Sequence, residues 1–159
     1  MTGVQTCALP ILGAKDPLHK RGIKTEVIDQ WIKSETVEYL GTTDDVRHFI
    51  DQADCIVLPS YREGTPRTLL EAASSSKPII ATDVPGCHNI VVHNLNGLLC
   101  KVKDANDLAG KMTEMAALDD NTLKEFGLNG RKKVELQFNE KFVITKYIET
   151  LAKLRTAPY

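Results

Sequence analysis

The chain has 159 residues, 42% of them hydrophobic, with 20 basic against 21 acidic residues and a formal charge of −1. These proportions are typical of one soluble globular domain with a buried core. The balance of charge argues against a nucleic-acid or membrane-surface binder, because both need a clustered excess of Lys and Arg. No apolar run approaches the roughly 20 residues that a membrane-spanning helix requires.

Residues 1–11 resemble the in-frame translation of a sequencing-library adapter and share no pattern with the rest of the chain. A signal peptide is the alternative, but the segment has no basic n-region, and Gln5 and Thr6 interrupt its apolar stretch. We therefore expect residues 1–11 to lie outside the fold. The domain is predicted over 12–155, and we expect it to be truncated at its N-terminus.

The central part of the chain alternates helical patterns with short apolar runs that are rich in β-branched residues. Helices are predicted over 25–33, 44–52 and 66–75, and strands over 37–40, 55–58, 78–81 and 97–100. This alternation predicts an α/β fold with a Rossmann-like parallel sheet and helices on both of its faces.

The C-terminal part is predicted to be helical over 105–118, 121–137 and 140–154. The last of these helices carries an apolar stripe at three-and-four spacing, made by Phe142, Ile144, Tyr147, Ile148, Leu151 and Leu154. We expect the stripe to be buried in the core, or alternatively against a second domain.

The segment from Leu58 to Ala72 carries the polar residues of greatest interest. It leads from a strand through a Gly-containing loop into a helix, for which Thr65 is a suitable N-cap and Pro66 a suitable first residue. The amides of Arg67 and Thr68 then point out of the helix start, where the helix dipole favours an anion. We therefore predict a diphosphate site there, beyond the carboxyl ends of the strands.

Two carboxylates, Glu63 and Glu71, flank this predicted site. A carboxylate beside a phosphate is useful only if it accepts hydrogen bonds from hydroxyl groups, which sugars supply. The simpler alternatives are an i,i+4 ion pair of Glu71 with Arg67 and a solvated loop charge at Glu63. These residues alone leave both alternatives open.

The spacing of Glu63 and Glu71, preceded by LPSYR and followed by KPIIATDVPG, resembles the C-terminal, donor-binding half of glycosyltransferase family 4. Members are retaining enzymes with two Rossmann-like domains, the GT-B fold. The resemblance covers about residues 12–154. It is strongest to bacterial enzymes that use UDP-sugars to build capsule, O-antigen or lipid-linked glycans.

The resemblance implies a role for each matching residue. Glu63 would be the catalytic residue that binds and orients the transferred sugar, and Glu71 would bind the ribose hydroxyls. The remaining substrate-binding residues would be Gly64, Thr65 and Pro66 along the sugar, Arg67 and Thr68 at the diphosphate, and Gly41 and Thr42 at the base. Asp83 and Gly86 would shape the crevice.

The same resemblance implies the ligands and partners. A nucleotide-sugar is the donor substrate, with a glycan or lipid-linked acceptor, and neither a cofactor nor a metal is expected. The acceptor would be held by an N-terminal Rossmann-like domain that is missing here, so we expect this chain alone to be inactive. Association with the inner face of a membrane is expected only through that domain or the acceptor. The alternative is a stand-alone nucleotide-binding or regulatory module without transferase activity.

Two departures from the family pattern are Ser76, where a Gly is common, and Asn89, where an acidic residue is common. We expect the first to affect packing only and the second to weaken any carboxylate role in that loop. Asp44 and Asp45 are predicted to open a helix, not to bind a metal.

The four cysteines, Cys7, Cys55, Cys87 and Cys100, form no Cys-x-x-Cys pair and have no histidine at zinc-ligand spacing. We therefore predict neither a disulfide framework nor a structural metal, and a reducing cytoplasm. Cys55 is expected in the core, and Cys87 is expected in a loop as an accessible thiol.

Overall fold

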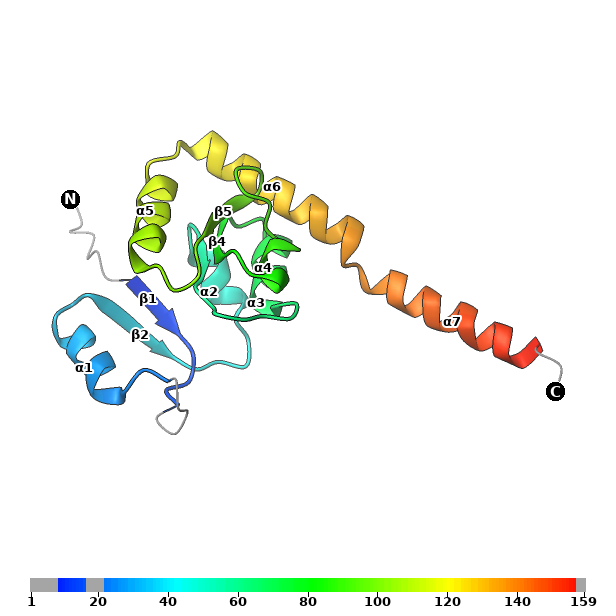
Figure 1. The fold of residues 1–159 in the computed structure, drawn as a ribbon, viewed down its shortest axis with the longest axis horizontal. Coiled ribbons are helices and arrows are strands. Elements are labelled where there is room, and N and C mark those ends of the chain that lie inside the picture. Colours follow the sequence, from blue (N-terminus) through cyan, green and yellow to red (C-terminus); the bar gives the residue numbers. More distant parts are fainter. Residues whose placement is uncertain (1–8, 17–21, 157–159) are drawn as a thin grey trace. The chain divides into compact units, whose positions relative to one another are not determined.

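The computed structural model describes residues 9–16 and 22–156, apart from the side chains of Leu154 and Thr156. The chain forms two compact units (Figure 1). The first ends at Val46 and the second begins at Arg47.

The first unit is a β–α–β motif. It consists of β1 (Leu9–Leu12), α1 (Thr25–Lys33) and β2 (Val37–Gly41), with the two strands parallel. Helix α1 has the predicted bounds, and β2 extends one residue further than predicted, to Gly41, whose φ is +76°.

Strand β1 corrects the expected start of the fold. Leu9, Pro10 and Ile11 were predicted to lie outside it, yet they pair with β2, and the Leu9 amide donates to the carbonyl oxygen of Thr36 at 3.1 Å. The physical reason is that LPIL is an apolar segment that can pair with an open strand edge. Residues 1–8, including Cys7, lie outside the described residues, and the origin of residues 1–11 stays a prediction.

The second unit is built on the parallel sheet β3-β4-β5, with β4 in the middle. Its elements in chain order are α2 (Arg47–Gln52), β3 (Ile56–Leu58), α3 (Arg67–Ser74), β4 (Ile79–Thr82), α4 (Pro85–His88), β5 (Gly97–Cys100), α5 (Ala105–Ala116), α6 (Asp120–Gln137) and α7 (Glu140–Thr156). The described strands therefore form two parallel sheets, one in each unit. The prediction of a parallel α/β fold is confirmed, although α4 was not predicted.

Successive residues of β4 face opposite sides of the sheet, and every one of them is buried. Ile79 and Ala81 pack with side chains of α3 and α4, whereas Ile80 packs with side chains of α5 (Figure 1). Helix α6 contributes to both sides, Phe126 to one cluster and the partly buried Val134 to the other. Helices on both faces, as predicted, give each face of this sheet its own core.

Helix α3 ends in a backbone motif that involves Ser76. The amide of Ser76 donates to the carbonyl oxygen of Ala73, and that of Lys77 to the carbonyl oxygen of Ala72, each at 3.0 Å. Ser76 has φ +56°, in the left-handed region, which costs a residue with a Cβ roughly 1–2 kcal/mol. The departure at Ser76 was expected to affect packing only, and this is wrong, because the position constrains the backbone.

Gly127 in α6 lies directly against this motif. A Cβ on Gly127 would overlap the carbonyl oxygen of Ser76 and lie 2.7 Å from its carbonyl carbon. Gly127 thus allows α6 to pack closely on the end of α3.

Helix α2 begins at Arg47, later than the predicted start at Asp44. The Asp45 amide donates to the hydroxyl of Thr43 at 3.1 Å, and that hydroxyl also lies 3.1 Å from the Asp45 carbonyl oxygen. This local turn competes with the helix for the same backbone groups.

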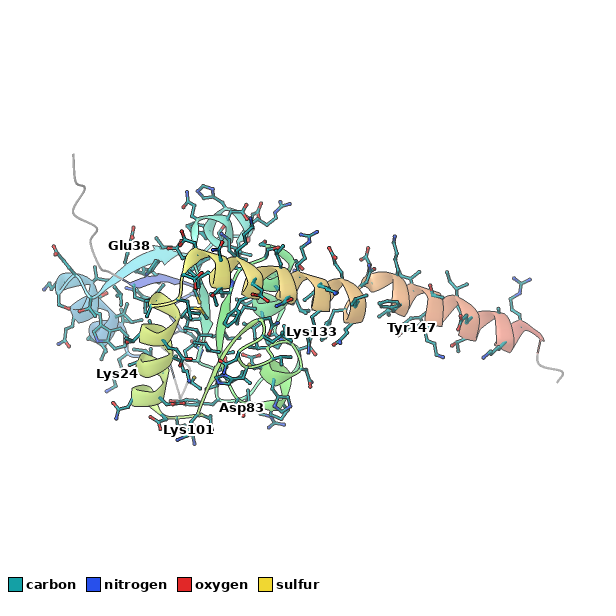
Figure 2. The ribbon with its side chains drawn as sticks, turned by 90° about the horizontal axis from the view of Figure 1, so that it is seen from above. Lys24, Glu38, Asp83, Lys101, Lys133 and Tyr147 are labelled. Carbon is teal, nitrogen blue, oxygen red and sulfur yellow. The ribbon has the colours of Figure 1, made fainter. Side chains whose placement is uncertain are left out.

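The prediction that the apolar stripe of α7 is buried in the core of this chain is wrong, whereas packing against a second domain stays a prediction. Phe142, Ile144, Tyr147, Ile148 and Leu151 are all exposed, and Figure 2 shows Tyr147 projecting from α7. Periodicity identifies an apolar face but not the surface that covers it, and no described residue of this chain covers it. None of the described helices is both long enough and apolar enough to cross a membrane.

We predict opposite effects of one substitution at two helical glycines. Gly110→Ala in α5, where an added Cβ meets nothing within 4 Å, should raise the free energy of unfolding by about 1 kcal/mol, because Ala favours the helix. Gly127→Ala should lower it by about 1–3 kcal/mol through overlap with Ser76. Urea unfolding measures both, and two changes of the same sign would contradict the packing described here.

Candidate functional site

The candidate site is the loop that joins β3 to α3, residues 59–66. Its beginning is held by Thr82, the last residue of β4. The Thr82 hydroxyl lies in hydrogen-bonding contact with the carbonyl oxygen of Ser60 and 3.4 Å from that of Leu58. The end of the buried central strand therefore fixes where the loop starts.

The middle of the loop rests on α4. A Cβ on the buried Gly86 would overlap the carbonyl oxygen of Gly64 and lie 2.6 Å from that of Glu63. Only a glycine allows the two backbones to approach so closely. Gly86 therefore shapes this loop through its missing side chain, whereas its expected role in shaping a ligand crevice stays a prediction.

The start of α3 differs by one residue from the prediction. Pro66, with φ −68° and ψ 119°, is the N-cap, and the helix begins at Arg67. The amides of Leu69 and Leu70 donate to the Pro66 carbonyl oxygen, and Thr65 makes no capping hydrogen bond. Thr65 was expected to be the cap, but the extended backbone at Pro66 moves the helix start by one position.

This correction leaves the predicted anion site in place. The amides of Arg67 and Thr68 are the first two of the helix and have no acceptor within the described chain. They lie where the helix dipole favours negative charge. Two amides can thus donate to one anionic group.

Glu71 pairs with Arg67 in this structure. The distance from Arg67 Nη2 to Glu71 Oε1 is 3.4 Å, and the two side chains are 90% and 35% exposed. Such an exposed i,i+4 pair contributes only a few tenths of a kcal/mol, so a ligand can displace it at little cost. The simple ion pair and a binding role for Glu71 are therefore compatible.

Glu63 is partly buried beside Cys87. Burial raises the pKa of Cys87 to about 11, and the negative charges of Glu63 and Cys100 add to that shift. Cys87 was expected to be an accessible loop thiol, but it is fully buried in α4, which sequence reasoning missed. The signal for α4 was Pro85, a suitable first helical residue.

The loops after β4 and β5 lie at the same end of the sheet, since the Asp83 amide donates to the Cys100 carbonyl oxygen at 2.8 Å. Figure 2 shows Asp83 and Lys101 near each other at this end of the sheet. His88 Nδ1 lies 3.1 Å from Asp83 Oδ1. Lys103 Nζ lies 5.6 Å from the centre of the Tyr61 ring, a contact that the sequence did not reveal.

The remaining candidates lie outside this loop in the sequence. Gly41 and Thr42 belong to the first unit, so their place in a common site stays a prediction. Asn89 is exposed immediately after α4.

The cysteines and acidic residues offer no metal centre in the part of the chain that the structure describes. No group of three or more His, Cys, Asp and Glu residues there is arranged to hold a metal ion. Cys55, Cys87 and Cys100 are free thiols, and burial raises the pKa of Cys55 to about 12, so these thiols are poor nucleophiles at neutral pH.

Comparison with known proteins adds to this geometry. The family described as "Glycosyl transferases group 1" matches residues 18–133. The chain is 32% identical over 120 residues to the N,N'-diacetylbacillosaminyl-diphospho-undecaprenol alpha-1,3-N-acetylgalactosaminyltransferase of Campylobacter jejuni, covering 76% of this chain and 31% of that protein. It is 30% identical over 100 residues to the UDP-Gal:alpha-D-GlcNAc-diphosphoundecaprenol alpha-1,3-galactosyltransferase of Escherichia coli, covering 63% and 25%.

Among solved structures, the sucrose-phosphate synthase of Thermosynechococcus elongatus is similar, with a TM-score of 0.80 and 27% identity. The match covers 94% of this chain and 39% of that one. The chain thus spans between a quarter and two fifths of the length of these three proteins.

We predict that Gly86→Ala disturbs the loop selectively. The added Cβ should lower the free energy of unfolding by about 1–3 kcal/mol and shift the amide NMR signals of Glu63 and Gly64, because it overlaps their backbone. Gly64→Ala is the matched control, since a Cβ there meets nothing within 4 Å, and it should change stability by less than about 0.5 kcal/mol. Equal losses in the two variants would argue against the close approach.

Proposed function

Because the chain belongs to the glycosyl transferases group 1 family, we propose that it is the C-terminal, donor-binding domain of a retaining family 4 glycosyltransferase. Its α/β arrangement matches GT-B glycosyltransferase structures. In the whole protein, a sugar would pass from a UDP-sugar to a glycan or lipid-linked acceptor in polysaccharide biosynthesis.

The observation that carries this proposal is the pair of acceptor-free amides at Arg67 and Thr68, flanked by Glu63 and Glu71. The amides would donate to the diphosphate, and the carboxylates would accept hydrogen bonds from hydroxyl groups on either side of it. A nucleotide-sugar has this order of groups: ribose hydroxyls, diphosphate and sugar hydroxyls.

Each carboxylate has its own task in this proposal. Glu71, one turn inside α3, would bind the ribose hydroxyls once the diphosphate draws Arg67 away. Glu63, held by Gly86, would bind hydroxyls of the transferred sugar beside the bond that breaks. Gly64, Thr65 and Pro66 would line the sugar. During transfer the bond from the anomeric carbon to the β-phosphate oxygen would break and UDP would leave. The acceptor oxygen would bond to that carbon, and its proton would pass to the departing β-phosphate oxygen.

The names of the two relatives support the choice of substrates. One name specifies UDP-Gal, and both specify a diphospho-undecaprenol carrier and a hexosyl or N-acetylhexosaminyl transfer. We accordingly propose a donor of that class and a lipid-linked or glycan acceptor, with a second Rossmann-like domain as partner. No cofactor or metal is part of this proposal.

We predict that UDP binds the chain in the millimolar range and perturbs the NMR signals of residues 63–71. Glu71→Gln should weaken UDP binding by ~1–3 kcal/mol, because a charged acceptor for the ribose hydroxyls is lost. Glu63→Gln should leave UDP binding nearly unchanged and weaken only the additional binding of a UDP-sugar. Equal losses of UDP affinity in the two variants would contradict the division of roles.

We also predict that this chain by itself transfers no sugar. Holding the acceptor oxygen against the anomeric carbon can supply ~7–11 kcal/mol of the barrier reduction, and the proposed acceptor site belongs to the partner domain. Radiolabelled UDP-galactose with a lipid-linked acceptor provides the assay, with Glu63→Ala as the control. Product above the level of that control would show that this chain is sufficient for transfer.

A further inference from the structure

Lys103 differs from the other exposed lysines of the second unit in two ways. Its backbone has φ +60°, in the left-handed region that residues with a Cβ disfavour. Its ammonium lies over the face of Tyr61, with Nζ 5.6 Å from the ring centre. Tyr61 belongs to the loop that carries Glu63, so Lys103 connects the end of β5 with the candidate site.

The charges of the candidate site explain why a further cation matters. The loop and the first turns of α3 contain two carboxylates, those of Glu63 and Glu71. They also contain two guanidinium groups, those of Arg62 and Arg67, so the formal side-chain charges of this segment cancel before a ligand binds. A nucleoside diphosphate brings two to three negative charges, whereas helix-start amides offer only about half a positive charge. A complete diphosphate site at this loop needs another positive group within reach.

We propose that Lys103 is that group: it binds the diphosphate of the nucleotide-sugar from the β5 side of the loop, while the amides of Arg67 and Thr68 bind it from the α3 side. This inference rests on the proposed function. Without ligand, the Tyr61 ring holds the ammonium beside the loop. A cation–π contact at an exposed ring is weak, and Tyr61 is 58% exposed, so the flexible side chain can exchange the ring for phosphate oxygens.

Lys101 provides a matched comparison. It lies two residues earlier in the same loop and carries the same charge. Its amide donates to Asp107 Oδ2 at 2.6 Å. Figure 2 shows Lys101 near Asp83, and the Asp83 amide donates to the carbonyl oxygen of Cys100, the residue before Lys101. A general effect of positive charge would be shared by both lysines, whereas a direct contact would be confined to Lys103.

The experiment is a titration of the chain with UDP, and with uridine as a ligand without phosphate. Lys103→Met should weaken UDP binding about 5- to 20-fold, Lys101→Met less than about twofold, and Lys103→Arg should retain most of the affinity. Uridine binding should be the same in all variants. Equal weakening by Lys101→Met and Lys103→Met, or none by Lys103→Met, would overturn the proposal.

Lys103→Gly separates binding from a merely structural role. Glycine relieves the left-handed backbone, so the melting temperature should rise, while UDP binding should fall as in Lys103→Met. A lowered melting temperature with unchanged UDP binding would show that Lys103 serves the fold only. Failure of the unaltered chain to bind UDP would contradict the proposed function as well, whereas UDP binding that ignores Lys103 would contradict only the present proposal.

Discussion

The geometry of the candidate site depends on one close backbone approach, that of Gly86 to the carbonyl groups of Glu63 and Gly64. Gly86 follows the buried strand β4, whose last residue, Thr82, holds the start of the same loop. The end of β4 and the helix α4 that follows it therefore locate a loop that has no regular structure of its own. Rigid support of this kind is what a binding site needs, because polar groups placed in advance lose little entropy when the ligand arrives.

The strands and helices of the second unit could be predicted because their side chains alternate with clear periods. Ile79, Ile80 and Ala81 form a continuous apolar run, as expected for a strand covered on both faces. The start of α3 could be predicted only to within one residue, because Pro66 suits both the cap and the first turn. Ser76 shows a different limit, since serine gives no sign of the left-handed backbone that it adopts here.

Contacts between distant segments were the least predictable feature. The candidate residues 63–71 are consecutive in sequence, and their spacing together with the flanking segments carried the resemblance that indicated the site. The Tyr61–Lys103 contact joins the loop after β3 to the loop after β5, and these two strands lie on either side of β4 in the sheet. No pattern in the sequence pairs the two loops. The apolar stripe of α7 is a related case, because an amphipathic pattern specifies which side chains prefer burial but not which surface covers them. The same holds for β1, whose apolar residues gave no indication of their pairing with β2.

The hydrogen-bond and ion-pair partners of the polar groups at the site indicate how a nucleotide would bind. In the described part of the chain, every buried side-chain polar atom has a hydrogen-bond partner, and the Arg67–Glu71 pair occupies the two groups that a nucleotide would use. Binding would exchange partners: Arg67 and the helix amides would turn to phosphate oxygens, and Glu71 would turn to hydroxyl groups. Each charge keeps a partner throughout, so the desolvation cost that normally opposes the burial of charged groups stays small. The affinity of this chain would then be set mainly by how many cations reach the diphosphate, and on this proposal one additional lysine would have a large effect at this position.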